Sequence, residues 1–169
     1  MTSPISELEL EALHPACFGW AMGCCNWDRA EAEDVLQTVY LKVLDRRARF
    51  HGRSSLKTWL YAVIRHTAAA RRRRRWWGQL LSERLLQSQP PPDAAPDAQT
   101  LASESQTSAR LRAALRALPE RQRDTLHLVF YEDLTVEEAA VVLGVSIGSA
   151  RTHYHRGKAR LRTLLERPA

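Results

Sequence analysis

Residues 134–161 constrain the fold more than any other part of this 169-residue chain. Thr135 and Glu138 have the spacing of a capping box, which opens a helix. Gly144 lies where a helix ends in left-handed geometry, and Ser146 is placed to cap a second helix two residues later. Two helices joined by so short a turn predict a helix-turn-helix, whose second helix enters the major groove of DNA.

The second helix of this pair is basic on its outward side. At about 100° per residue, Ile147, Ala150, Tyr154 and Leu161 share one side and are expected to pack on the first helix. Short polar and basic side chains occupy the other side, where they reach base edges and phosphates. The alternative is a solvated basic helix in an ordinary bundle, but the caps, the glycine turn and the lack of acids coincide. The candidate DNA contacts are Ser149, Arg151, Thr152, His155, Arg156 and Lys158.

The charge of the chain favours a polyanionic partner. The net charge is +6, and it is concentrated in this helix and in the run Arg71–Arg75. The first residues are acidic and lack a long apolar run, so no signal peptide is expected. No stretch approaches the roughly 20 apolar residues that span a bilayer. We therefore expect a cytoplasmic protein without membrane insertion.

Three cysteines occur near the N-terminus, and all are expected to be reduced in the cytoplasm. Cys17, Cys24 and Cys25 with His14 form a loose metal set, but the adjacent pair lacks the usual C-x-x-C spacing. Burial as small apolar residues is favoured, and a thiol sensor is the alternative. No metal or other cofactor is expected.

The N-terminal part is predicted to be helical, with one helix over residues 10–25 and another from Ala30. The outward stripe of the helix from Ala30 is Asp34, Gln37, Thr38 and Leu41, in which a leucine lies beside an acid and an amide. Such a stripe is either an ordinary surface with one exposed leucine or a protein-docking surface. The buried face is expected to contain Ala32, Val35, Leu36, Val39, Tyr40, Val43 and Leu44.

A third helix is expected from Ser54 or Ser55, after a loop that contains Phe50 and Gly52. It runs into Arg71–Arg75 and two tryptophans, a pattern that suits nucleic acid because arginine meets phosphate and aromatic rings stack on bases. The alternative is a solvated helix end favoured by the helix dipole. The core face of this helix is predicted to be Leu56, Leu60, Val63, Ile64 and Thr67.

The composition changes over residues 78–108, which are rich in proline, serine, glutamine and alanine. Beyond them, Pro119 is placed to open a helix over 120–131 with Leu126, Val129 and Phe130 inward. The chain is thus predicted to be all-α. Two small helical domains, residues 1–77 and 109–169, are joined by a flexible linker over residues 78–108, and the second domain is the helix-turn-helix.

Two separated blocks, taken together, resemble bacterial sigma factors of the extracytoplasmic-function (ECF) group. The first reads AEDVLQTVYLKVL and then FHGRSSLKTWLYAVIRHTAAARRRRR, and it is similar to the family's region 2. The second reads LPERQRDTLHLVFYEDLTVEEAAVVLGVSIGSARTHYHRGKARL, and it is similar to region 4. The resemblance covers nearly the whole chain.

The resemblance implies a promoter-specificity subunit that binds core RNA polymerase and directs initiation from −35 and −10 elements. The stripe from Asp34 to Leu41 falls where the family docks on the clamp helices of the largest subunit, and the flap of the second-largest subunit is the other expected contact. The recognition-helix residues given above match the family's −35 contacts, and an anti-sigma factor is an expected partner. The residues implied for the −10 element and the DNA upstream are Phe50, Arg53, Ser54, Lys57, Trp59, Arg65, His66, Arg72 and Arg73.

Three features depart from the family pattern. His66 stands where many relatives have asparagine, and Gly157 interrupts the recognition helix at a cost near 1 kcal/mol relative to alanine. The run from Arg71 to Trp77 extends region 2 beyond the usual motif, which predicts extra contacts with the DNA backbone upstream of the melted region.

Two other functions fit less of the sequence. A stand-alone helix-turn-helix repressor or activator would leave the Asp34–Leu41 stripe and the first basic block without a role. A nucleic-acid enzyme would have to use His51, His66, His153 or His155, and no paired carboxylates, metal spacing or nucleophile elbow accompany them. The protein is therefore expected not to be an enzyme.

Overall fold

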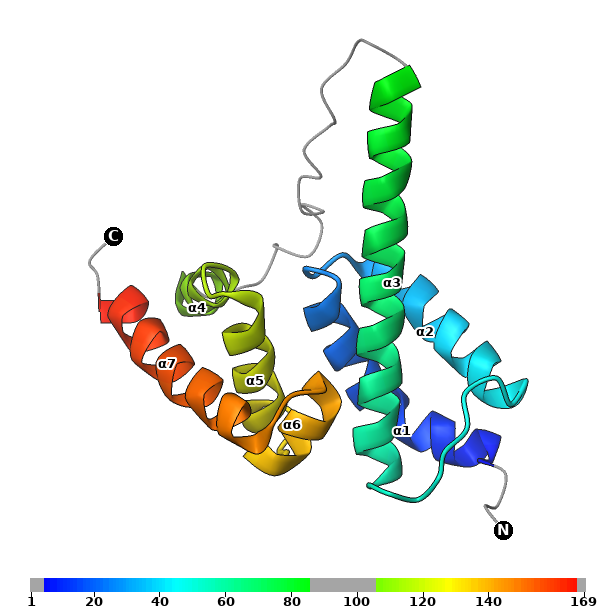
Figure 1. The fold of residues 1–169 in the computed structure, drawn as a ribbon. Coiled ribbons are helices and arrows are strands. Elements are labelled where there is room, and N and C mark those ends of the chain that lie inside the picture. Colours follow the sequence, from blue (N-terminus) through cyan, green and yellow to red (C-terminus); the bar gives the residue numbers. More distant parts are fainter. Residues whose placement is uncertain (1–4, 86–105, 167–169) are drawn as a thin grey trace.

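The computed structural model describes residues 5–85 and 106–166, and the regular structure in these ranges is α-helical (Figure 1). This confirms the predicted all-α class. The first three helices are α1 (Glu7–Cys24), α2 (Arg29–Leu44) and α3 (Leu56–Leu85). The second domain contains α4 (Gln106–Arg116), α5 (Glu120–Phe130), α6 (Val136–Leu143) and α7 (Ile147–Glu166).

Local side-chain caps explain where the first two helices begin. Ser6 and Glu9 form a capping box at the start of α1. The Asp28 side chain accepts a hydrogen bond from the backbone N–H of Glu31 at the start of α2. The predicted buried face of α2 is confirmed at Ala32, Val35, Leu36, Val39 and Val43.

Two residues of that predicted face differ from the expectation. Tyr40 is only half-buried, and Leu44 is exposed. Leu44 is the last residue of α2, so its side chain lies beyond the stretch that packs against the other helices. Periodicity alone gives no sign of where that contact ends.

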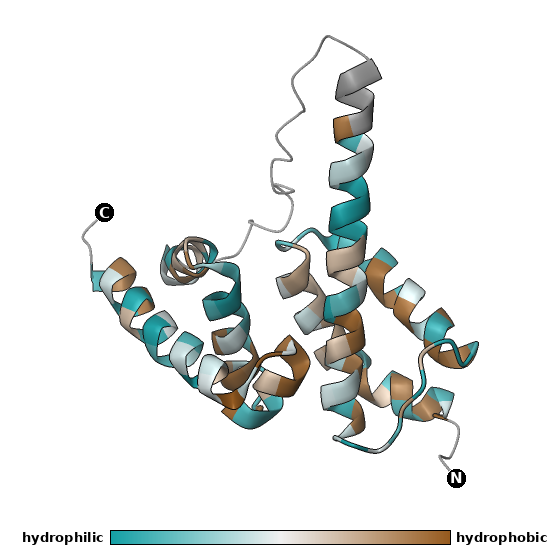
Figure 2. Ribbon diagram, in the orientation of Figure 1, coloured by the Kyte–Doolittle hydropathy of each residue, from teal (hydrophilic) through white to brown (hydrophobic). Residues whose placement is uncertain are grey.

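Helix α3 is the central element of the fold. It packs against α1 and α2 on one side and against α6 of the second domain on another. Leu60, Ile64 and Thr67 are buried as predicted, and Thr58 and Tyr61 are buried as well. The prediction missed the last two because the second domain covers this additional side of α3. Figure 2 shows α6 and the beginning of α3 as hydrophobic, whereas α3 becomes hydrophilic further along.

Helix α3 continues beyond Trp77 to Leu85, and α4 begins at Gln106. Helical structure therefore extends into both ends of the segment 78–108 that was predicted as a linker. Residues 86–105, which make up the rest of that segment, lie outside the described residues. The arginines, tryptophans and leucines around residue 78 have adequate helix propensity, and one glycine does not outweigh them.

The helix-turn-helix forms through the predicted caps. Thr135 and Glu138 make the capping box of α6, and Gly144 ends this helix with φ of 62°. The Ser146 hydroxyl then accepts a hydrogen bond from the backbone N–H of Ser149 at 3.1 Å, which caps α7. These local contacts fix the turn that sets α7 against α6.

Two hydrophobic residues of the second domain were predicted to be inward and are not. Phe130 is 55% exposed, and Leu128 on the same helix is fully buried against the first domain. Ile147 is also exposed, because α7 makes its buried contacts further along at Ala150 and Gly157. Ile147, in the first turn of α7, therefore lies outside the part of the helix that is buried against the rest of the domain.

Gly157 allows α7 to lie close to α5. A Cβ atom at this position would be 3.2 Å from Leu126 Cγ and 3.3 Å from Gln122 Cβ. These distances are shorter than ordinary van der Waals contact, so an added side chain would force Leu126 and Gln122 to shift by a few tenths of an ångström. The glycine that weakens the helix on its own is thus the residue that lets the two helices approach.

Replacing Gly157 with leucine is expected to destabilise the fold by about 1–3 kcal/mol through overpacking. Urea unfolding followed by circular dichroism measures this change. The matched control is Gly148→Leu on the same helix, where a Cβ atom would meet only Ser146 Oγ at 4.0 Å. Equal unfolding midpoints for the two variants would contradict the close packing at Gly157.

Candidate nucleic-acid interface

The outward side of α7 presents the predicted recognition residues together. Ser149, Arg151, Thr152, His155, Arg156 and Lys158 are all exposed. The opposite side is held against the domain by the buried Ala150 and Gly157. Since a helix has one orientation once its buried side is fixed, these six residues share a solvent-facing surface.

Some of these side chains already have partners within the second domain. Arg151 forms an ion pair with Glu137 at 2.8 Å, in which both side chains are largely exposed. Such exposed pairs contribute little free energy, so the guanidinium can exchange the carboxylate for DNA. The Lys158 Nζ atom lies 5.1 Å from the centre of the Tyr154 ring, which orients the ammonium by a cation–π contact.

The loop before α3 packs against α3 itself through an aromatic pair. The rings of Phe50 and Trp59 are 5.5 Å apart between centroids, and both side chains are half-buried. Arg53 is exposed and Ser54 is partly exposed, so the loop presents polar groups beside the two rings. The structure thus brings together loop and helix residues that the resemblance assigned to one site.

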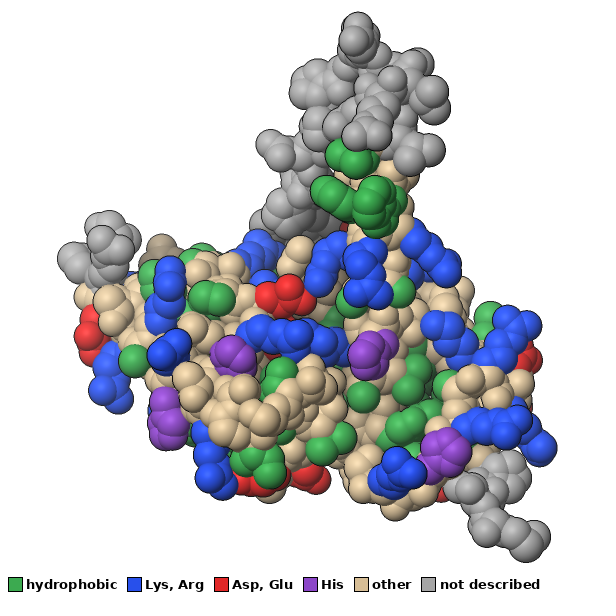
Figure 3. All heavy atoms as spheres, viewed as in Figure 1, with side chains coloured by type: hydrophobic (Ala, Val, Ile, Leu, Met, Phe, Trp, Pro, Cys, Tyr) green, Lys and Arg blue, Asp and Glu red, His purple; other side chains and the backbone are tan. Residues whose placement is uncertain are grey.

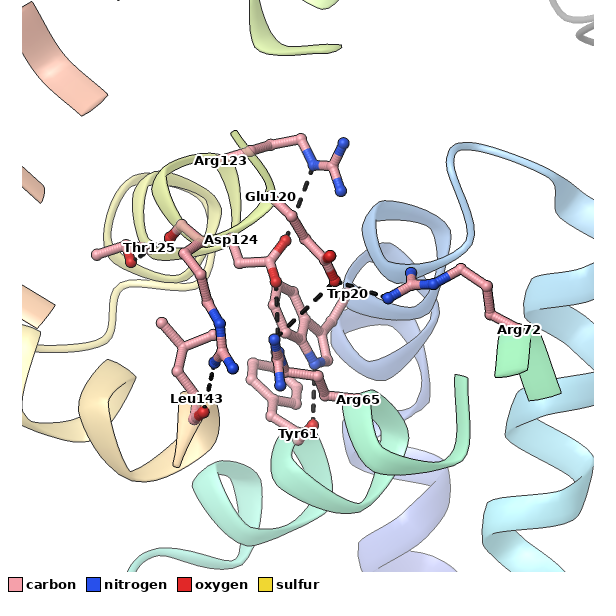
Figure 4. Close-up of polar contacts among 10 residues, drawn as sticks. Trp20, Tyr61, Arg65, Arg72, Glu120, Arg123, Asp124, Thr125 and Leu143 are labelled. Carbon is pink, nitrogen blue, oxygen red and sulfur yellow. Dashed lines mark hydrogen bonds and ion pairs between the residues drawn. The ribbon is translucent and has the colours of Figure 1, made fainter. Parts of the chain in front are cut away.

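The basic residues predicted along α3 fall into two sets. His66 and Arg73 are exposed to solvent. Lys57, Arg65 and Arg72 instead contact acidic residues of the second domain, and the Arg65 and Arg72 contacts appear in Figure 4. The resemblance implied DNA contact for all five of these residues. Nothing in the sequence indicated that three of them would instead contact acids of the second domain.

Three acids of the second domain make these contacts. The Glu120 Oε1 atom is 2.9 Å from Arg72 Nη2, and the Asp124 Oδ2 atom is 3.3 Å from Arg65 Nε (Figure 4). The backbone oxygen of Glu132 accepts a hydrogen bond from the Lys57 ammonium at 2.7 Å. The Glu132 carboxylate also accepts from the Tyr61 hydroxyl.

Burial and neighbouring charges shift the pKa values of these acids in different directions. Burial alone would raise the pKa of Glu132, but hydrogen bonds from His127 and Tyr61 outweigh it and lower the pKa overall. The pKa of Glu120 is also lowered, because the hydrogen bond and charge of Arg72 outweigh partial burial. At Asp124, burial dominates and raises the pKa of the carboxyl.

The arginine run at the end of the first domain is also divided. Arg71 lies 2.9 Å from Asp34, and Arg75 lies 2.8 Å from Glu31, so these two guanidinium groups are bound to α2. Arg73 and Arg74 are exposed. The adjacent Trp76 and Trp77 are 55% and 56% exposed on the part of α3 that projects from the body of the protein (Figures 1 and 3).

The stripe predicted for polymerase binding lies on the surface of α2. Leu41 is 61% exposed, and Asp34 and Gln37 are exposed beside it. Thr38 is partly buried, and its hydroxyl donates to the backbone oxygen of Asp34 at 2.8 Å. The stripe is thus exposed apart from Thr38, as a docking surface requires.

The cysteines contribute to the core of the first domain. Cys17 and Cys25 are buried, and burial raises the pKa of each thiol to about 12. Burial also raises the pKa of Cys24. Thiols in this state stay protonated at neutral pH, which argues against the sensor alternative. Within residues 5–85 and 106–166, no group of His, Cys, Asp and Glu is placed to hold a metal ion.

No helix in the described part of the chain is both long enough and apolar enough to span a bilayer.

Comparison with known proteins identifies the family. Residues 10–78 match the model of sigma-70 region 2, and residues 108–161 match that of sigma-70 region 4. The chain is 33% identical over 143 residues to the ECF RNA polymerase sigma factor SigX of Bacillus subtilis, covering 82% of this chain and 73% of SigX. It is 31% identical over 131 residues to the sigma factor YlaC of the same organism, covering 78% and 75%.

Solved structures agree on the fold. The sigma factor RpoE, in complex with the anti-sigma factor NepR from Bartonella quintana, superposes with a TM-score of 0.74 at 23% identity, covering 96% of this chain and 98% of that one. CnrH, in complex with the cytosolic domain of CnrY, gives 0.63 at 18% identity, covering 94% and 86%. Both domain matches and the relatives of known class lead to one conclusion: the chain belongs to the ECF group of RNA polymerase sigma factors and is a promoter-recognition subunit, not an enzyme.

Proposed function

We propose that this sigma factor reads the −35 element as duplex DNA with α7 and holds the −10 region along α3 and the loop before it. The observation that carries the proposal is the single exposed surface formed by the six recognition residues of α7. Arginine at such a position pairs with guanine, and the shorter polar side chains reach other base edges. Because the polymerase that it serves works on the chromosome, we place this activity in the cytoplasm.

The first domain supplies the other contacts in this proposal. Phe50, Trp59 and His66 line the path of the unpaired strand, because their rings can stack on exposed bases. Arg53, Ser54 and the basic residues of α3 hold its phosphates. The Asp34–Leu41 stripe docks on the clamp helices of the largest subunit, and the second domain contacts the flap of the second-largest. An anti-sigma partner is proposed from the complexes in which RpoE and CnrH were solved.

Transcription in vitro with core polymerase on a library of genomic fragments tests the function directly. Mapped start sites are expected to share two upstream elements. Holoenzyme carrying Arg156→Ala is expected to bind these promoters about tenfold more weakly and to tolerate changes in the −35 element, since a bidentate contact contributes about 1–3 kcal/mol. Arg29→Ala removes the same charge from α2 and serves as the control. Initiation no higher than with core polymerase alone would refute the proposal.

Leu41→Asp is expected to weaken binding to core polymerase about tenfold or more, because it places a charge in the apolar centre of an interface. A pull-down of core polymerase without DNA measures the effect. Leu8→Asp is the matched control, since Leu8 is an exposed leucine on α1 that is even more accessible than Leu41. Equal losses for both variants would show that α2 is not the docking surface.

The two sets of arginines at the end of α3 predict different salt dependence. Arg73→Ala with Arg74→Ala is expected to reduce the slope of log affinity against log salt for promoter binding by roughly 1–2. Arg71→Ala with Arg75→Ala removes the same charge from side chains bound to Asp34 and Glu31, and it is expected to change the slope little. An unchanged slope in the first variant would contradict DNA contact by this run.

A further inference from the structure

A cavity of about 310 Å³ lies between α1, with the turn after it, and helices α4, α5 and α7. Most of its wall consists of apolar and aromatic side chains. The lining includes Trp20, Trp27, Leu115, Leu126, Phe130 and Leu161. Sites for small molecules are concave and mostly apolar, and their volumes begin at about 300 Å³. This cavity therefore has the size and the character of a ligand site.

The aromatic part of the wall is held in place by a histidine. The ring of His127 lies 5.2 Å from that of Trp20 and 5.4 Å from that of Tyr131, measured between centroids. Gly23 on α1 leaves room for this ring, because a Cβ atom there would be 2.9 Å from His127 Cε1. Protein interiors contain few voids larger than a water molecule. Here the contacts among the rings keep the wall apart from the residues opposite, so the cavity is preformed.

The backbone at Trp27 is strained where its side chain lines the cavity. This residue has φ of 67°, in the left-handed region that bulky residues rarely adopt. The Arg112 guanidinium lies 5.4 Å from the centre of the indole ring, which adds a cation–π contact. Strained backbone of this kind costs free energy and gathers at binding sites. The conformation of Trp27 is thus a second feature that is typical of a site.

One polar atom of the cavity wall is a buried donor. The Arg123 Nε atom is buried and has no hydrogen-bond partner among the described residues. Its ion-pair partner Asp124 Oδ1 is 3.8 Å away, which is too long for a hydrogen bond (Figure 4). A buried donor without a partner costs free energy. A ligand that carries an acceptor would satisfy this N–H group.

The charges around this donor favour a neutral ligand. Asp124 also lines the cavity, and its carboxylate pairs with Arg65 at 3.3 Å as well as with Arg123. A charged ligand would lose its hydration beside groups that already have counter-charges. A carbonyl oxygen accepts a hydrogen bond without adding charge.

The volume of the cavity sets the size of the ligand. An apolar cavity of about 150 Å³ holds one benzene ring. This one has about twice that volume, which is room for two fused rings. Phe130 and Tyr131 line the cavity and are exposed, so a ligand can enter on their side.

We propose that this cavity binds a neutral, planar molecule of two fused aromatic rings, whose carbonyl oxygen accepts a hydrogen bond from the Arg123 Nε–H group. The rings of the ligand lie among Trp20, Trp27 and the leucines of α4 and α5. None of the residues that line the cavity is among those assigned above to DNA or to the stripe on α2. The inference therefore does not depend on the proposed function.

Coumarin, a bicyclic aromatic lactone, is the probe, and it is titrated into the full-length chain labelled with ¹⁵N. The indole N–H signals of Trp20 and Trp27 in NMR spectra are expected to shift, with a dissociation constant of about 1 mM or tighter. The signal of Trp76, which lines a different hollow, is expected to stay unchanged. Indole has two fused rings and no carbonyl, and it is expected to bind about tenfold more weakly. The anion 2-naphthoate is also expected to bind more weakly than coumarin.

Two variants test the residues of the site. Arg123→Met is expected to lower the affinity for coumarin about tenfold and to leave that for indole unchanged. Arg116→Met removes an exposed arginine outside the cavity and is the matched control. Leu115→Trp fills the cavity and is expected to abolish binding of both probes. If this variant does not fold, the comparison of the two arginine variants decides.

Four results would overturn the proposal. They are the absence of shifts at Trp20 and Trp27, a shift at Trp76 in their place, equal or tighter binding of indole or 2-naphthoate than of coumarin, and equal loss of coumarin binding in the two arginine variants.

Discussion

The packing of α3 on two sides joins the two domains and determines which of its basic side chains are exposed. One side of this helix joins the core of the first domain, where Trp20 donates its indole N–H to the backbone oxygen of Tyr61 at 3.0 Å. Another side meets the second domain, where the Tyr61 hydroxyl donates to Glu132. Buried residues of both domains therefore form one continuous hydrophobic core. What remains exposed on α3 is His66 together with residues 72–79, which lie on the part of the helix that projects from the body of the protein.

The other two proposed surfaces are exposed in this arrangement. Helix α7 is held by Ala150 and Gly157, so its polar side faces solvent whether or not the domains touch. Helix α2 buries Val35, Leu36 and Val39 and leaves Leu41 outside. The proposed −35 surface and most of the proposed polymerase stripe are thus exposed, whereas Lys57, Arg65 and Arg72 of α3 contact acidic residues.

Local chemistry made much of this fold predictable from sequence. The capping box at Thr135 and the left-handed Gly144 depend only on neighbouring residues, and both appear as predicted. Phe130 and Tyr61 depend on how one domain meets the other, which helical periodicity does not encode. Glu120 and Asp124, the acids of α5 that contact α3, were missed for the same reason. The sequence feature that could have indicated these contacts is the alternation of acids and arginines from Glu120 to Asp124. The same pattern is typical of a solvent-exposed helix.

The central claim is that α3 packs against helices of both domains, so that the two domains are docked in the free protein. Energy transfer between dyes at positions 53 and 162, one in each domain, measures this most directly. The account predicts a high-efficiency state for the free chain, which is lost when urea unfolds the protein. A low efficiency in the folded free chain would contradict it.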